Sequence, residues 1–172
     1  MTEHVFTYRD FLGIALVATG VYLFAHKKQV TSKINNLLMP RGYRNNNPLN
    51  IRINNANNWK GRKLPNTDGA FEQFISMPYG YRAAIITLQN YIRSGYNTLE
   101  KIINRWAPSD DNNDPNGYMR VIYQETGYAP KATFTATDKQ GISNLIYAMA
   151  IVENGRTIMP DRSQIAEAWE IL

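Results

Sequence analysis

The sequence contains no cysteine and only two histidines among its 172 residues. The absence of cysteine excludes a disulfide framework and a thiolate nucleophile. Both histidines, His4 and His26, precede residue 41, where we expect the globular domain to begin. That domain therefore has no Ser-His-Asp or Cys-His arrangement, and it lacks the usual ligands of a zinc hydrolase. No metal or cofactor is expected, and carboxylates must carry any proton transfer.

Acidic residues are in the minority, with 14 Asp and Glu against 19 Lys and Arg, which gives a formal net charge of +5. A basic balance suits an anionic partner such as a nucleic acid, lipid headgroups or an acidic cell-wall polymer. The basic residues are spread along the chain and form no long run. We therefore expect no specific nucleic-acid partner.

Long apolar runs are also scarce, and the main one lies near the N-terminus at residues 11–25. This uncharged run predicts a single transmembrane helix, whose reach Lys27 and Lys28 would lengthen by snorkelling. A cleaved signal peptide and a buried helix are the alternatives. The predicted organisation is a membrane anchor at 1–28, a linker at 29–40 and a globular domain at 41–172.

The globular part predicts an α+β fold, mostly helical with a small β-hairpin sheet. Alternating apolar residues at 49–53 and 71–75 are typical of short strands, with a turn between them at 54–58. Helical periodicity and capping residues follow. The predicted helices run over 78–94, from a cap at Thr98 to Trp106, from a cap at Asp114 to Gly127, over 138–153 behind a capping box of Thr137 and Gln140, and from a cap at Asp161 to Ile171.

An asparagine-rich block at 41–52 is followed by Trp59-Lys60-Gly61. Amide side chains both donate and accept hydrogen bonds, as sugar hydroxyls and N-acetyl groups require, and aromatic faces can carry a sugar ring. Asparagine is also a favoured turn residue, so a polar hairpin connection is the alternative. The candidate sugar contacts are Asn47, Asn50, Trp59 and Tyr118, and a structural role is the alternative for each of them.

Four segments together resemble the hairpin half of lysozyme-like cell-wall hydrolases: Asn46-Asn-Pro-Leu-Asn-Ile-Arg52, Trp59-Lys-Gly61, Phe71-Glu-Gln-Phe74 and Gly80-Tyr-Arg-Ala83. The pattern is most similar to phage and prophage virion-associated lytic proteins, and it continues through residues 104–108 and Tyr118 to Glu153-Asn-Gly155. The resemblance covers residues 41–155 and implies a lysozyme-like fold with lytic transglycosylase or muramidase activity. In similar glucosaminidases the helix with the catalytic glutamate precedes the hairpin. Here Glu-Asn-Gly comes last, so we infer a circular permutation.

Glu153 is the candidate catalytic acid, because it follows the apolar stretch 147–152 and emerges beside a glycine turn. Partial burial there would disfavour the charged carboxylate and suit a general acid. Glu72, on a predicted strand, is the runner-up. A single carboxylate favours a lytic transglycosylase or a substrate-assisted mechanism.

The function predicted from these features is a membrane-anchored phage enzyme that cleaves the glycan strand of peptidoglycan during genome delivery or lysis. The alternative is a non-enzymatic, membrane-anchored structural virion protein whose lysozyme-like domain binds glycan or capsid proteins. The expected partners are peptidoglycan, a membrane through residues 11–25, and other virion proteins. The expected location is a virion with an internal or associated membrane, or the host inner membrane with the domain acting on the periplasmic wall.

Overall fold

The computed structural model describes residues 21–29, 38–111 and 113–172. The chain divides into two compact units, Met1–Met39 and Pro40–Leu172. In the first unit, residues 21–29 are helical and their side chains are exposed. The second unit contains the remaining helices and the candidate site, and it is described below by itself.

The prediction of a membrane anchor, and of the membrane location that followed from it, is corrected by the structure. Within the described ranges, no helix has both the length and the apolar character needed to cross a membrane. Of the predicted segment 11–25, residues 11–20 lie outside the described residues, so their part of that prediction has no structural counterpart here.

The second unit is built from helices. They are α2 (Arg41–Arg44), α3 (Met77–Arg93), α4 (Leu99–Trp106), the 3₁₀ turn η1 (Ser109–Asp111), α5 (Pro115–Thr126), α6 (Lys139–Asn154) and α7 (Arg162–Glu170). Five of them, α3 to α7, have ends close to those predicted, whereas α2 and η1 were not predicted. The caps at Thr98, Asp114 and Asp161 are confirmed, since each side chain accepts a backbone N–H of its helix. For α6 the capping side chain is Asp138 rather than Thr137.

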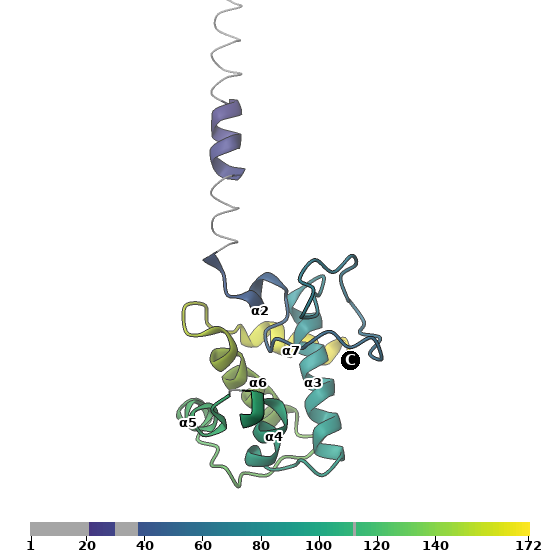
Figure 1. Ribbon diagram of the computed structural model, residues 1–172, viewed down its shortest axis with the longest axis vertical. Coiled ribbons are helices and arrows are strands. Elements are labelled where there is room, and N and C mark those ends of the chain that lie inside the picture. The colour runs from purple at the N-terminus through teal and green to yellow at the C-terminus, as the bar shows by residue number, and fades with distance from the viewer. Residues whose placement is uncertain (1–20, 30–37, 112) are drawn as a thin grey trace, which may run out of the picture. The chain divides into compact units, whose positions relative to one another are not determined.

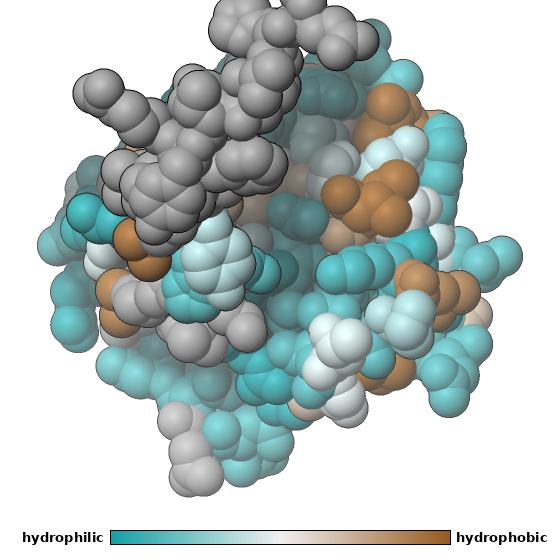
Figure 2. Space-filling view, turned by 90° about the horizontal axis from the view of Figure 1, so that it is seen from above, coloured by the Kyte–Doolittle hydropathy of each residue, from teal (hydrophilic) through white to brown (hydrophobic). Residues whose placement is uncertain are grey.

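Helix α6 is the centre of the domain. It contacts α2, α3, α5 and α7, and α3 and α7 also lie side by side (Figure 1). Its apolar residues Leu145, Ile146, Ala148, Met149 and Ala150 are fully buried, and their removal from water is the main contribution of this helix to stability. Among the coloured residues of Figure 2, hydrophilic residues predominate and hydrophobic residues are scattered. Glu153 lies in the last turn of this buried helix.

The predicted hairpin sheet is wrong. Among the described residues there is no strand, only three isolated antiparallel bridges: Arg52 with Phe71, Arg62 with Phe74, and Thr98 with Thr133. The fold of the described part is helical, and the segments between α2 and α3 form long loops. The reason lies in the asparagine side chains. Asn47 accepts the N–H of Ile51 and donates to the carbonyl of Glu72, two groups that a regular ladder would join to each other.

Candidate functional site

A groove of about 830 Å³ opens between the loop that follows α2 and the ends of α4 and α6. Its volume lies within the range of small-ligand sites. Four aromatic rings line it, from Trp59, Phe71, Tyr91 and Trp106. The other lining residues are Leu49, Asn50, Ile51, Arg52, Ile53, Asn54, Asn55, Asn57, Thr87, Ala107, Asp111, Asn113 and Glu153. The groove thus combines flat apolar faces with amide groups, and it includes Asn50 and Trp59, two of the four candidate sugar contacts.

Glu153 lies in this groove, in the last turn of α6, which Gly155 ends by donating its N–H to the Ile151 carbonyl. The carboxyl group is half-buried and accepts three hydrogen bonds. Trp106 Nε1 and the Tyr118 hydroxyl each donate to Oε1 at 3.0 Å, and Asn50 Nδ2 donates to Oε2 at 3.0 Å. The three donors come from α4, α5 and the loop after α2, so the carboxyl group is held from three directions.

Tyr118 lies behind Glu153 and does not line the groove. Burial raises the pKa of its hydroxyl well above the usual value, and the charge of Glu153 and the hydrogen bond to it act in the same direction. The hydroxyl therefore stays protonated at any physiological pH. Unlike the indole of Trp106, a hydroxyl can accept as well as donate. Tyr118 can consequently partner the carboxyl group in either protonation state.

Asn50 reaches Glu153 because its backbone adopts φ = 50°, in the left-handed region that asparagine tolerates better than most residues. Its Oδ1, and the Nε1 of Trp59, are buried without a hydrogen-bond partner among the residues that the structure describes. Buried polar atoms are normally satisfied, so each of these two atoms has capacity for one further hydrogen bond, for example to a water molecule. Gly61, two residues after Trp59, lies against Tyr79, whose ring a β-carbon would hit.

Asn47 has a structural role in this geometry. Its side chain is fully buried. The amide nitrogen donates to the carbonyls of Ile51 and Glu72, and the oxygen accepts the N–H of Ile51. Every polar atom of the side chain is therefore in use, and Asn47 does not line the groove.

Glu72 is also internal. It is 1% exposed and forms an ion pair of 2.7 Å with Arg62, so its carboxylate stabilises the loop region and does not face the groove. Of the two glutamates proposed from the sequence, only Glu153 lies where a ligand can reach it. The sequence interpretation missed Trp106 as a partner of the acid, although Trp106 lies within the residues 104–108 that carried the resemblance.

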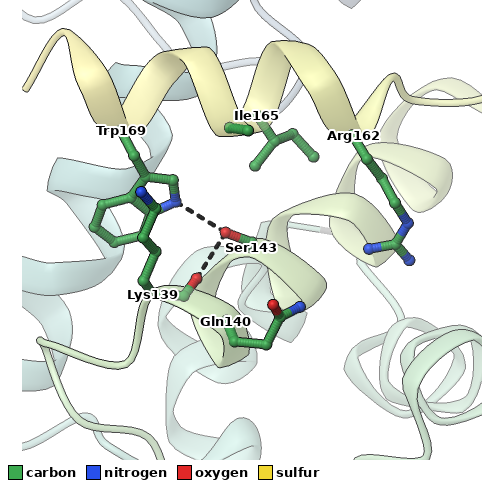
Figure 3. A pocket seen from close by; sticks show the side chains of 7 residues that line it. Lys139, Gln140, Ser143, Arg162, Ile165 and Trp169 are labelled. Atoms are coloured by element: carbon green, nitrogen blue, oxygen red, sulfur yellow. Dashed lines mark hydrogen bonds between the residues drawn. The ribbon is translucent and has the colours of Figure 1, made fainter.

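A smaller cavity of about 390 Å³ lies between α6 and α7 (Figure 3). Its polar groups satisfy one another. Trp169 Nε1 donates to Ser143 Oγ at 2.8 Å, and Ser143 Oγ donates to the Lys139 carbonyl at 2.6 Å. Lys139 pairs with Glu170 at 3.0 Å. Because these groups are already partnered, we assign no function to this cavity. Among the described residues, no cluster of His, Cys, Asp or Glu could hold a metal ion.

No protein-family model matches the chain. The chain is 34% identical to Protein P5 of Pseudoalteromonas phage PM2 over 118 residues, which make up 67% of this chain and 71% of that protein. The relative is a bacteriophage protein, as the sequence interpretation expected for this chain. At this level of identity and coverage, the chain belongs to the family of Protein P5 of Pseudoalteromonas phage PM2.

Proposed function

We propose that this protein cleaves the glycan strand of peptidoglycan and that Glu153 is the catalytic acid. One observation carries the proposal: the Glu153 carboxyl group lies in an aromatic-lined groove and is oriented by Asn50, Trp106 and Tyr118. Such fixed orientation is typical of catalytic groups. A glutamate with only a structural role would have no need of an open groove in front of it.

The composition of the groove supports a carbohydrate ligand. Trp59 and Tyr91 offer aromatic faces, while Asn54, Asn55 and Asn57 surround them with amide groups. Amides match the hydroxyl and N-acetyl groups of amino sugars, because both partners donate and accept hydrogen bonds. The kinship with a phage protein supports a role at the bacterial wall, during genome delivery or lysis.

In the proposed reaction, Glu153 donates its proton to the glycosidic oxygen between N-acetylmuramic acid and N-acetylglucosamine, and the bond from that oxygen to C1 of the muramic acid breaks. The Glu153 carboxylate then takes the proton of the C6 hydroxyl of the same muramic acid, whose oxygen forms the 1,6-anhydro bond to C1. No water is consumed. If water attacks C1 instead, the product is a reducing sugar, as in a muramidase.

The test uses the full chain and dye-labelled sacculi. We expect the unsubstituted protein to release soluble dye and Glu153→Gln to release at least a hundredfold less, because the substituted amide cannot donate a catalytic proton. Glu167→Gln is the matched control, since Glu167 is exposed on α7 and away from the groove. Mass spectrometry of the products separates anhydro from reducing ends.

Equal release by the unsubstituted protein and Glu153→Gln would remove Glu153 from the mechanism. Binding to sacculi without any release by the unsubstituted protein would favour the second candidate, a non-enzymatic virion protein that binds glycan. The carboxyl group in the groove favours the enzyme over this binding protein.

A further inference from the structure

Two guanidinium groups flank the ring of Phe71, and they differ in one respect. Arg41 Cζ lies 4.4 Å and Arg52 Cζ 5.5 Å from the ring centroid. Arg41 is neutralised by Asp68, to which it donates two hydrogen bonds of 2.8 and 2.6 Å. Arg52 forms neither an ion pair nor a hydrogen bond to any side chain in the described ranges. The charge of Arg52 is therefore available to a ligand, whereas that of Arg41 is not.

Arg52 is also held at the groove. Its backbone is paired with Phe71 in an antiparallel bridge, which hydrogen bonds from Glu72 N to Ile51 O and from Ile53 N to Ala70 O support on either side. Ile51 is buried, whereas Arg52 is exposed and lines the groove. Stacking on an aromatic ring limits the movement of a guanidinium and leaves its N–H edge free.

A free guanidinium edge recognises a carboxylate through two parallel hydrogen bonds. Arg52 is the only cationic side chain among the lining residues of the groove in the described part of the chain. The sugar rings of peptidoglycan are uncharged. Its carboxylates lie on the stem peptides attached to the muramic acid or, where a stem peptide has been removed, on the lactyl group that carried it. A ligand that fills this groove can therefore satisfy Arg52 only through a carboxylate on the muramic acid substituent, either that of the stem peptide or that of the free lactyl group.

We propose that Arg52 forms a carboxylate-binding subsite that selects glycan with free carboxylates on its muramic acid substituents over neutral glycan. This inference rests on the proposed function, because it assumes that glycan occupies the groove. Arg52 then acts on substrate choice and takes no part in bond cleavage.

The experiment measures binding by calorimetry with the full chain carrying Glu153→Gln, which prevents turnover. Three probes are compared: a muropeptide (disaccharide with stem peptide) with free carboxylates, the same muropeptide with its carboxylates amidated, and a neutral chito-oligosaccharide. We expect the free muropeptide to bind about tenfold more tightly than the amidated form, as one charge-assisted contact would give. Adding Arg52→Gln should abolish this difference and leave chito-oligosaccharide binding unchanged.

Two further variants sharpen the result. Arg120→Gln removes the same charge from an exposed position on α5 that lies away from the groove, and it should keep the tenfold preference. Arg52→Lys keeps the charge but loses the planar fork, and it should keep only part of the preference.

A preference that survives Arg52→Gln would overturn the subsite, and so would an equal loss of affinity for all three probes. Failure of the proposed function would give a different result from failure of the subsite. If none of the probes binds and the unsubstituted chain releases nothing from sacculi, the glycan-cleaving assignment itself fails.

Discussion

Asn50 Nδ2 lies 3.0 Å from Glu153 Oε2, and this hydrogen bond joins two residues that are 103 positions apart. It connects the asparagine-rich loop to the end of α6, across the groove that both segments line. The orientation of the acid thus depends on a loop asparagine whose backbone is in the left-handed region.

Replacing Asn50 with glycine should reduce kcat about tenfold to a hundredfold without unfolding the domain. Glycine keeps the positive φ, so the substitution removes the donor and spares the backbone. A hydrogen bond to a charged group contributes about 1.5–3 kcal/mol. The control is Asn46→Gly, since Asn46 has the same φ of 50° but donates to the Phe74 carbonyl instead of Glu153. Equal kcat values for the two variants would contradict this role of Asn50.

Tyr118→Phe should lower kcat about tenfold with little change in Tm. The substitution removes only the hydroxyl that donates to Glu153 Oε1, and the buried ring stays in place. Tyr123→Phe is the matched control, because Tyr123 is exposed on the same helix. Dye release and thermal unfolding measured on both variants distinguish an orienting hydroxyl from a packing residue. If Tyr118→Phe lowers Tm and leaves kcat unchanged, the residue is structural.

Glu72→Gln should show the opposite behaviour to Glu153→Gln. Loss of the buried partner of Arg62 should lower the free energy of unfolding by about 3 kcal/mol, while kcat per folded molecule stays near that of the unsubstituted protein. Urea unfolding and dye release, measured at a temperature where the variant is folded, check both parts. A catalytic loss without destabilisation would move Glu72 into the site.

Asp68→Asn should destabilise the domain at neutral pH, and the effect should fade in acid. The hydrogen bonds from Arg41 are the main reason why the pKa of Asp68 lies below its usual value, with further contributions from Asn45 and two backbone N–H groups. A depressed pKa stabilises the fold fully above the unfolded value of about 4, and this stabilisation is lost as the pH falls towards the folded value. Urea unfolding of both proteins at pH 7, 4 and 3 should show a shrinking difference. A constant difference would mean that the amide disturbs packing instead.

Asp111→Asn should retain activity within about threefold and leave the products anhydro. Asp111 is the second carboxylate among the residues that line the groove. Hydrolases that use water generally need two carboxylates, whereas the proposed anhydro reaction needs only Glu153. Loss of activity together with reducing products would indicate a two-carboxylate muramidase.

The helices were predictable because their signals are local. Thr98, Asp114 and Asp161 cap their helices as expected, and Gly127 ends α5 at φ = 74°. The sheet was not predictable in the same way. The alternating residues at 49–53 resemble a strand, but the left-handed backbone of Asn50 and the internal hydrogen bonds of Asn47 interrupt it. Nothing in the local pattern indicates which asparagine amides face a groove and which replace the backbone hydrogen bonds of a β-ladder.

The candidate site was predictable in part. Glu153 and Trp59 lie on the same groove, as the sequence interpretation proposed. The roles of Tyr118 and Trp106 as hydrogen-bond donors to Glu153 depend on how α4 and α5 pack against α6, and sequence spacing does not specify this packing. Arg52 was noticed only as part of a motif, because its lack of an acidic partner becomes visible only in three dimensions.

The contacts of Asn154, the residue after Glu153, also have a consequence for how the protein folds during its synthesis. Asn154 donates to the Pro48 carbonyl at 2.7 Å, and its side chain lies against Gly42, where a β-carbon would collide with it. Contacts across more than 100 residues form late, because the intervening chain must first be available. On the ribosome, the groove can therefore assemble only after α6 has emerged.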